Sequence, residues 1–481
     1  MRRVAGSVLV ILGLVSIVAG FQRSPAKVGP PTGPNRLVNV DRPGINAHNS
    51  PAVAVNPSRP QMLAVADRID TPRQSCSVKR SNDGGATWAQ PLALGDCFWP
   101  DVAFEGGGNL LVLTTTLGGP FNQPVGVWLQ RFDGGAPAGP RIRVAGSEAY
   151  HARLAVDGER VVVTWVQAGA EAARKPLGFP PPPNPIVVAR SNDGGRSFSS
   201  PVRVGEPSRL VVQPRVILGP GERVVVGALD LGDDLLDYQG GHEGQGGPPD
   251  EGRWALVSWT STDGGSTFGP AAVAARDLVI PQRIYSDLAP APGFALDRSA
   301  DRLFATWDAG RGDGRDVFLA RSDDGGATWS GPTPVAPRAG AQFLPMVDVA
   351  PDGRVDVVFY DRGGDPSDVM TEVTLASSWD GGRSFITTTV SDRSFDSRIG
   401  FGSAQGLPML GSQLAVVSEP DRALAFWSDT RNASVDDNAQ DLAVGAVAIR
   451  NRAGRRWPMS AMGAALLLLG AALALRPARG A

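Results

Sequence analysis

A short motif recurs along the chain at similar intervals, and this repeat restricts the fold more than any other feature of the sequence. The motif is Ser-x-Asp-x-Gly-x-[Thr/Ser]-[Trp/Phe], and five copies begin at Ser81, Ser191, Ser261, Ser322 and Ser378. Phe132-Asp-Gly-Gly is a degenerate sixth copy. The aspartates are Asp83, Asp133, Asp193, Asp263, Asp324 and Asp380, at intervals of 50, 60, 70, 61 and 56 residues. Intervals of this size accommodate one four-stranded unit per repeat.

The chemistry of the motif is that of a turn. An aspartate can accept hydrogen bonds from nearby backbone N–H groups, and the glycine can take a positive φ. The final aromatic ring can pack between sheets. We therefore interpret all six aspartates as structural residues and not as catalytic ones.

Short apolar or alternating segments precede each motif and predict strands separated by turns. Seven first strands are expected, starting at Pro51, Pro100, Ala152, Pro214, Ser286, Pro345 and Pro408. Residues 36–40 form an extra strand before the first unit, and its pairing with the last unit would close the ring and remove free edges. The prediction is an all-β chain with a single β-propeller of seven four-stranded antiparallel blades, with six as the alternative.

Composition supports a sheet protein and excludes other classes. Gly 60 and Pro 41 indicate many turns, while a hydrophobic content of 42% is sufficient for a packed core. The net charge of −2 argues against a nucleic-acid partner. Cys76 and Cys97 flank one predicted hairpin, so a structural disulfide is sterically reasonable in an oxidising compartment.

The two ends of the chain resemble targeting segments. Residues 1–20 read as a signal peptide or an N-terminal anchor. Residues 457–475 have the length and apolarity of a transmembrane helix, unless this end is a removable sorting signal. The remaining predicted parts are a Pro/Gly-rich linker at 21–34, the propeller at 35–450, a basic linker at 451–456 and a basic tail at 476–481. A propeller outside the cytoplasm, anchored to the membrane, is expected.

The first strands of a propeller line its central channel, so residues just after their starts should lie at the channel mouth. In ring order these residues are Ala52, Asp101, Arg153, Arg215, Asp287, Met346 and Met409, preceded in four blades by Trp99, His151, Gln213 and Tyr285. The two arginines could hold a carboxylate by bidentate hydrogen bonds, and an aspartate beside them could donate a proton if burial raised its pKa. A ring of Asp–Arg salt bridges is the structural alternative.

Charged residues also end several second strands, and they predict either repeated salt bridges or a charged rim around a binding mouth. They are Asp67-Arg68, Asp308 with Arg311, Asp361-Arg362 and Asp429 with Arg431. Long insertions at 168–185 and 231–253 are expected to be solvated loops on the same face. The insertion at 231–253 is acidic and could bind Ca²⁺, although the spacing of its acidic residues matches no calcium-binding loop. No other cofactor or metal is expected.

The repeated motif resembles the Asp box of the sialidase-like (BNR repeat) β-propeller superfamily, and the resemblance covers nearly all of residues 36–450. In that family the box closes the hairpin between the third and fourth strands of a blade. An exo-sialidase needs three arginines, an aspartate acid and a tyrosine nucleophile assisted by a glutamate. The family's [Phe/Tyr]-Arg-Ile-Pro motif is missing here. The candidates are Arg153, Arg215, Arg362 or Arg431 for the carboxylate, Asp101 or Asp287 as acid, Tyr285 or Tyr360 as nucleophile, and Glu243 or Glu419 as its partner.

Three functions remain open for such a chain, which is expected to be bacterial. The first is a membrane-tethered propeller that binds a glycan, peptide or protein at the channel mouth, with Trp99 and His151 suited to ligand contact. The second is an exo-sialidase-type glycoside hydrolase with a divergent site, and the third is a purely structural envelope module. A monomer is expected, because a closed propeller needs no partner to cover its edges.

Overall fold

The computed structural model describes residues 27–39, 46–119, 123–169, 184–206, 211–232, 254–278, 291–310, 314–402, 409–437 and 439–450. The chain divides into two compact units. One unit comprises residues 1–29 and 448–481, and only the outer ends of β1 and β31 are described in it. The other unit, residues 30–447, contains the rest of the described propeller and every candidate site residue discussed below.

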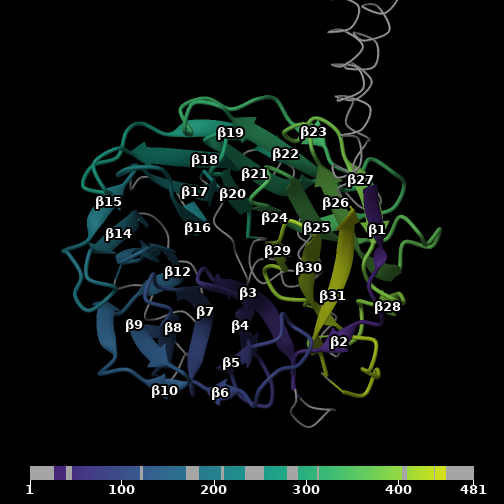
Figure 1. The fold of residues 1–481 in the computed structure, drawn as a ribbon, viewed down its shortest axis with the longest axis horizontal. Helices are drawn as coiled ribbons and strands as arrows, with labels where there is room; N and C mark the ends of the chain where they lie inside the picture. Colours follow the sequence, from purple (N-terminus) through teal and green to yellow (C-terminus); the bar gives the residue numbers. More distant parts are fainter. Residues whose placement is uncertain are drawn as a thin grey trace, which may run out of the picture. The chain divides into compact units, whose positions relative to one another are not determined.

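Seven antiparallel sheets follow one another around a centre, as Figure 1 shows, and the expected seven-bladed propeller is confirmed. Blade one contains β3 (His48–Asn56), β4 (Arg59–Ile69), β5 (Ser75–Ser81) and β6 (Leu92–Ala93). Blade two contains β7 (Cys97–Phe104), β8 (Leu110–Gly118), β9 (Gln123–Asp133), β10 (Ala136–Pro137) and β11 (Ile142–Ala145). Blade three contains β12 (Ala149–Asp157), β13 (Arg160–Gln167), β14 (Ile186–Ser191) and β15 (Val202–Val204).

The second half of the ring repeats this plan. Blade four contains β16 (Val211–Leu218), β17 (Val224–Asp230), β18 (Trp254–Ser261) and β19 (Ala272–Leu278). Blade five contains β20 (Gly293–Asp297), β21 (Arg302–Ala309), β22 (Asp316–Ser322) and β23 (Thr333–Pro334). Blade six contains β24 (Gln342–Val349), β25 (Val355–Asp361), β26 (Met370–Ser378), β27 (Ile386–Thr389) and β28 (Phe395–Asp396). Blade seven contains β29 (Ala415–Ser418), β30 (Arg422–Asp429), β31 (Asp441–Arg450), β1 (Lys27–Pro31) and β2 (Arg36–Leu37).

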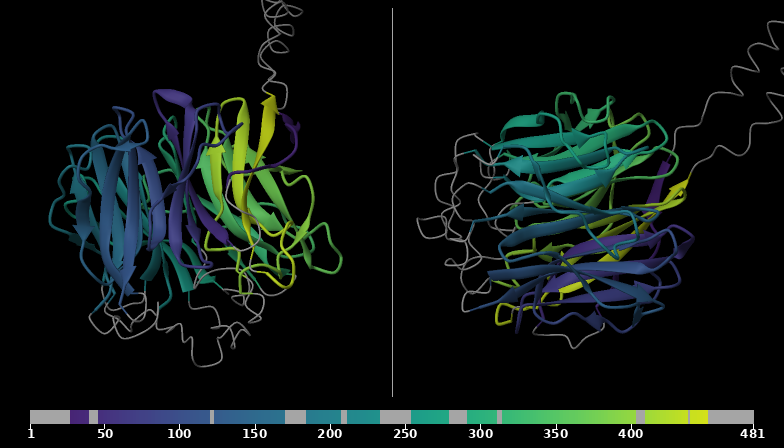
Figure 2. Two further views of the ribbon diagram at one scale, coloured as in Figure 1. Left: turned by 90° about the horizontal axis from the view of Figure 1, so that it is seen from below. Right: turned by 90° about the vertical axis from the view of Figure 1, so that its left-hand side faces the viewer.

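The N-terminal segment closes the ring, as the sequence predicts. Arg36 and Leu37 of β2 pair with Val444 and Ala443 of β31, and the Val38 N–H donates to the Leu442 carbonyl. The first and last strands of the propeller therefore share one blade (Figure 2). The predicted linker at 21–34 overlaps β1, which tolerates two prolines because it lies at the edge of its sheet.

Most first strands begin about three residues before the predicted starts, because they carry a bulge. In five of them the register shifts at the same place. The shift is centred on a non-glycine residue with a φ between 46° and 54°, namely Ser50, Trp99, His151, Gln213 or Leu344. In four of the five strands a proline follows this residue. Proline is tolerated there because the bulge interrupts the strand pairing, so no backbone N–H is needed as a donor. The predicted starts Ser286 and Pro408 lie outside the described residues.

The five full motifs form the predicted turns between third and fourth strands. In the first, the Ser81 hydroxyl donates to Asp83 Oδ1 at 2.7 Å, and the Thr87 N–H donates to the same oxygen at 2.8 Å. The Thr87 hydroxyl donates to Asp83 Oδ2 at 2.6 Å. Trp88 then packs edge-on against Phe426 of the neighbouring blade. The other four turns form the same bonds around Asp193, Asp263, Asp324 and Asp380.

Asp133 does not belong to this set, so its assignment as a sixth box is wrong. Asp133 pairs directly with Ala136, which leaves a two-residue hairpin made by Gly134 and Gly135. Both glycines have a positive φ, and this suits the tight turn. Asp133 lacks the serine two residues upstream, where the sequence has Arg131, and its side chain is exposed.

The described part of the chain contains no helix that is long and apolar enough to cross a membrane. The predicted segments at 1–20 and 457–475 lie outside the described residues, as do the linker at 451–456 and the tail at 476–481. Cys76 and Cys97 form the expected disulfide, with their Cα atoms 5.6 Å apart. It joins β5 of blade one to β7 of blade two.

Candidate ligand site at the channel mouth

Two predicted arginines converge on one side-chain amide. Arg153 and Arg215 directly follow the bulges of β12 and β16, the first strands of blades three and four. Their Nη2 atoms donate to Gln413 Oε1 at 2.8 and 2.5 Å. Gln413 Nε2 donates in turn to the Pro51 carbonyl at 2.7 Å. Four blades therefore meet in one hydrogen-bonded cluster.

Asp101, on β7, lies beside the two arginines. Its Oδ2 accepts the Leu154 N–H of the next blade at 3.0 Å, and its Oδ1 accepts the Val102 N–H. Burial raises the pKa of Asp101, although the charges of Arg153 and Arg215 act in the opposite direction. The sequence analysis thus brought Asp101, Arg153 and Arg215 together correctly.

The cluster has an excess of positive charge. Burial lowers the pKa of Arg153 and of Arg215, and for Arg215 the charge of Arg153 lowers it further. Among the residues that the structure describes, Asp101 is the carboxylate that raises both pKa values. Arg153 is 3% exposed, and its Nε has no hydrogen-bond partner in the part of the chain that the structure describes. A buried guanidinium group, that of Arg153, and a half-buried one, that of Arg215, share a neutral amide oxygen. Such a pair is an incomplete anion site, since the strongest acceptors for guanidinium groups are carboxylates.

Trp99 and His151 are buried beneath this site. Their rings meet edge to face with centroids 4.5 Å apart, and His151 Nδ1 accepts the Gln213 N–H at 3.2 Å. Burial, followed by the charges of Arg153 and Arg215, holds the pKa of His151 well below its ordinary value, so the imidazole is neutral. The exposed fractions are 2% for Trp99 and 0% for His151. These residues therefore shape the wall of the site and do not offer an open contact surface.

Tyr360 does not have the surroundings of a nucleophile. It is fully buried on β25, between Phe343 and Phe395, and its hydroxyl donates to the Ser428 carbonyl at 3.0 Å. Burial raises the pKa of Tyr360 well above its ordinary value, so the phenol remains protonated. Its assignment as a catalytic residue is accordingly corrected to a link between blades six and seven. Tyr285 and Asp287 lie outside the described residues, as does Glu243.

Arg362 and Arg431 are held in networks of their own. Arg362 donates to Thr371, to the Asp368 carbonyl and to Ser397. Arg431 pairs with Asp429 and Asp392. These bonds occupy both guanidinium groups, and the structure supplies no contact that makes either a third carboxylate ligand in the Arg153–Arg215 cluster.

The other charged residues at the ends of second strands form ion pairs, but mostly with partners that the sequence did not predict. Asp67 pairs with His48 and Lys79, while Arg68 pairs with Asp70. Asp308 pairs with Arg315, and Asp361 pairs with Arg338. Arg311 lies outside the described residues. Of the predicted pairs, Asp429 forms an ion pair with Arg431. Asp67 and Arg68 are adjacent on β4, so their side chains point to opposite faces of the sheet and take different partners.

Gln413 is the residue that sequence reasoning missed. The seventh first strand was expected at Pro408, with Met409 at the mouth, whereas β29 begins at Ala415. Blade seven has Gly411-Ser412 where most other blades have a residue followed by proline, so the proline signal is missing.

Among the described residues no group of three His, Cys, Asp or Glu side chains could hold a metal ion. The acidic insertion proposed for Ca²⁺ lies almost entirely outside them.

Comparison with solved structures places the fold in the β-propeller class. The chain is similar to a polysaccharide lyase of family PL25, an ulvan lyase, in two structures. For the one bound to -[GlcA(1-4)Rha3S]-, the TM-score is 0.51 at 12% identity, covering 83% of this chain and 94% of the lyase. For the other, the TM-score is 0.50 at 13% identity with the same coverage.

A sialidase from a Hadza microbial source is also similar, with a TM-score of 0.44 at 14% identity, covering 82% of this chain and 65% of the sialidase. No family model matches the sequence, and the search of curated proteins found no relative. At these identities the comparisons establish the fold alone, and the two lyase structures agree with the expected β-propeller.

Proposed function

We propose that this protein is a membrane-tethered, extracytoplasmic propeller that binds a carboxylate-bearing glycan at the channel mouth. The observation that carries the proposal is the convergence of Arg153 and Arg215 on Gln413 Oε1. A ligand carboxylate in place of that oxygen would accept charge-assisted hydrogen bonds from both arginines, and it would balance their charge. Gln413 then acts as an internal substitute for the ligand.

The similarity to the ulvan lyase is in keeping with this ligand class. That lyase is described in complex with a saccharide that contains GlcA, a uronic acid. Glycan binding without catalysis is preferred over the exo-sialidase alternative, because Tyr360, one of the two tyrosines that could be its nucleophile, is fully buried and bonded to Ser428. One observation favours the enzyme: Asp101 has a raised pKa beside the arginine pair, as a general acid requires.

The test is a titration of the full-length protein with sialyllactose, glucuronate oligosaccharides and neutral lactose. We expect the acidic saccharides to bind, and we expect Arg153→Gln and Arg215→Gln each to weaken binding about tenfold or more, because a charged hydrogen bond is lost. Arg203→Gln is the matched control, since Arg203 is an exposed arginine on β15. Equal binding of lactose would contradict the proposal. Turnover of a fluorogenic sialic-acid glycoside that depends on Asp101 would favour the enzyme.

A further inference from the structure

Blade one contains a buried cluster of three titratable side chains that the channel-mouth site does not use. Asp67 Oδ1 accepts a hydrogen bond from Lys79 Nζ at 2.5 Å, and Asp67 Oδ2 lies 2.5 Å from His48 Nδ1. The same nitrogen of His48 lies 3.4 Å from Lys79 Nζ. None of the three side chains is more than 1% exposed. An amine, a carboxyl group and an imidazole are therefore in mutual contact and shielded from water.

Three strands and the neighbouring blade hold this cluster in place. His48 begins β3, Asp67 lies on β4 and Lys79 lies on β5. Ser77 of β5 is directly opposite Asp67, so Lys79 is two residues further along the same face. Ser428 Oγ of blade seven donates to the His48 carbonyl at 2.9 Å. The backbone therefore fixes the approach of the amine to the carboxyl group.

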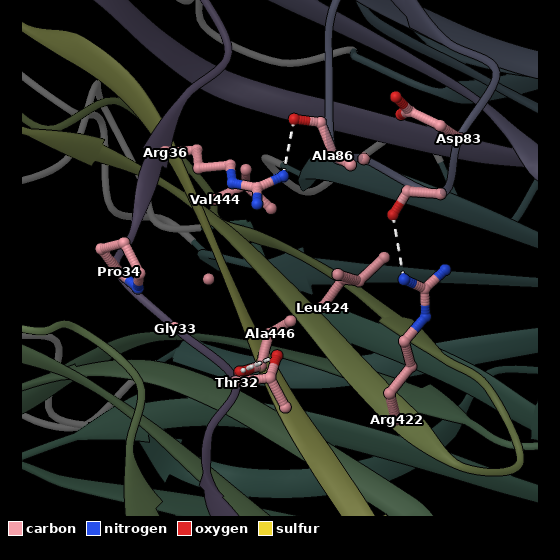
Figure 3. A pocket seen from close by; sticks show the side chains of 13 residues that line it. Thr32, Gly33, Pro34, Arg36, Asp83, Ala86, Arg422, Leu424, Val444 and Ala446 are labelled. Atoms are coloured by element: carbon pink, nitrogen blue, oxygen red, sulfur yellow. Dashed lines mark hydrogen bonds between the residues drawn. The ribbon is translucent and has the colours of Figure 1, made fainter.

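Lysine is an unusual choice for a buried ion pair in this chain. Of the 46 Lys and Arg residues, only three are lysines. Arginine supplies the cation in comparable pairs of the described residues, such as buried Arg354 with Asp356. Figure 3 shows another arginine, Arg422, which pairs with Glu419 beside the hollow where the ring closes. A guanidinium group is more weakly hydrated and binds a carboxylate through two N–H groups, so arginine suits a buried pair better. Lys79 offers what arginine lacks, an amine that becomes a nucleophile once it loses a proton.

We propose that Lys79 and Asp67 join in an intramolecular amide bond, with His48 as the catalytic residue that transfers protons. The reaction is a condensation. A bond forms between Lys79 Nζ and Asp67 Cγ, and the bond between Cγ and Oδ2 breaks. Two protons of the Lys79 ammonium group leave with Oδ2 as one water molecule, and the third stays on the amide nitrogen. The reaction needs no oxidant, reductant or further reactant, and it does not depend on the ligand proposed for the channel mouth.

The contacts of Asp67 supply each step of this condensation. Burial raises the pKa of Asp67, but Lys79 and His48 together lower it below its ordinary value, so the pair begins ionised. His48 Nδ1 lies between Asp67 Oδ2 and Lys79 Nζ, so it can pass protons from the amine to the departing oxygen. The Ser77 hydroxyl donates to Oδ1 at 2.7 Å and stabilises the negative charge that this oxygen gains when the amine attacks. Burial disfavours the charged pair and excludes the water that would compete with the amine.

The amide bond cross-links a part of the ring that already carries a disulfide. It joins β4 to β5 within blade one, whereas Cys76–Cys97 joins β5 to β7 of blade two. Both cross-links restrict the unfolded chain, and this stabilises the folded state. The amide bond, unlike the disulfide, resists reduction.

The test is peptide mapping of the full-length protein by mass spectrometry, after reduction, denaturation and digestion with trypsin. Trypsin does not cleave after an acylated lysine or before proline, so the expected product is peptide 37–68 joined to peptide 74–80. Its mass should be one water molecule below the sum of the two peptides. Recovery of separate, unmodified peptides 37–68 and 74–79 from the wild type would overturn the proposal.

Variants assign the atoms and the role of the imidazole. Lys79→Arg keeps the positive charge without the amine, so the joined product should disappear. His48→Gln should leave most of the protein unjoined, while Lys27→Arg, which replaces a lysine on β1, should join fully. Loss of water that persists in Lys79→Arg would indicate an ester between Ser77 and Asp67 and would overturn the amide. Full joining in His48→Gln would overturn the catalytic role of His48.

Discussion

Arg153 and Gln413 are 260 residues apart in the sequence, yet the Arg153 Nη2 atom donates to Gln413 Oε1 across the channel at 2.8 Å. The bond joins blade three to blade seven, so it can form only once the ring has closed. Ring closure in turn depends on the N-terminal strand β2, which pairs with β31. The candidate site is therefore a product of the complete propeller and not of any single repeat.

Two replacements of Gln413, by glutamate and by alanine, should change ligand binding in opposite directions. Gln413→Glu places a permanent carboxylate on Arg153 and Arg215, so we expect an acidic saccharide to bind about tenfold more weakly. Gln413→Ala removes the internal acceptor, so we expect tighter binding of the same saccharide. Without ligand, Gln413→Ala should lower the free energy of unfolding by about 1–3 kcal/mol, because buried donors lose their acceptor. Calorimetric titration and urea unfolding measure these effects.

Gln413→Met is the control for shape, since it retains the length of the side chain without an acceptor oxygen. It should behave like Gln413→Ala in the binding experiment. If Gln413→Glu bound the acidic saccharide as well as the wild type, the ligand would not occupy the position of Gln413, and the proposed site would be wrong.

The disulfide should contribute measurably to stability. Cys76 and Cys97 are 21 residues apart, and a cross-link of about this loop length stabilises a fold by roughly 3 kcal/mol. Reduction of the wild type should lower Tm, whereas the double variant Cys76→Ala/Cys97→Ala should have a low Tm that reductant does not change. Equal Tm values for oxidised and reduced wild type would show that the cross-link does not stabilise the folded state.

The sequence predicted the repeating parts of the molecule well and the unique parts poorly. The turns around Asp83 and its four equivalents were predictable, because the hydrogen bonds are local and each copy repeats the same residues. Arg153 and Arg215 were found from blade register. Gln413 was missed, because its role depends on partners in other blades and no local pattern marks it. The ion pairs of Asp67 and Asp361 also depend on three-dimensional neighbours, namely Lys79 and Arg338.

The repeated turns should make the protein sensitive to strong acid. Hydrogen bonds to each carboxylate lower the pKa of Asp83, Asp324 and Asp380 to about 2. A lowered pKa contributes stability that is present above pH 3.8 and is lost as the pH falls toward 2. Asp324→Asn should therefore reduce the free energy of unfolding at pH 7 and flatten its dependence on pH below about 4.

Asp133→Asn is the matched control, because Asp133 lies in a simple hairpin and not in one of these turns. It should leave both the stability and its acid dependence unchanged. A wild type whose unfolding free energy did not fall between about pH 4 and pH 2 would contradict the stabilising role of the turns.

Asp348 should produce the opposite dependence on pH. This residue lies on β24 and accepts the Ser418 N–H of blade seven at 2.7 Å. Burial, together with the nearby Asp356 carboxylate, raises the pKa of Asp348 from 3.8 to about 6. Between these two values the folded protein keeps a proton that the unfolded chain has released, so the contribution to stability falls as the pH rises from about 4 to 6.

Asp348→Asn removes this loss, because an amide can accept the Ser418 N–H without carrying a charge. The variant should gain about 2 kcal/mol over the wild type at pH 7 and nothing at about pH 4, where Asp348 is already protonated in the folded protein. Urea unfolding of both proteins between about pH 4 and pH 7.5 measures the difference. If Asp348→Asn gained the same amount at every pH, packing and not protonation would explain its stability.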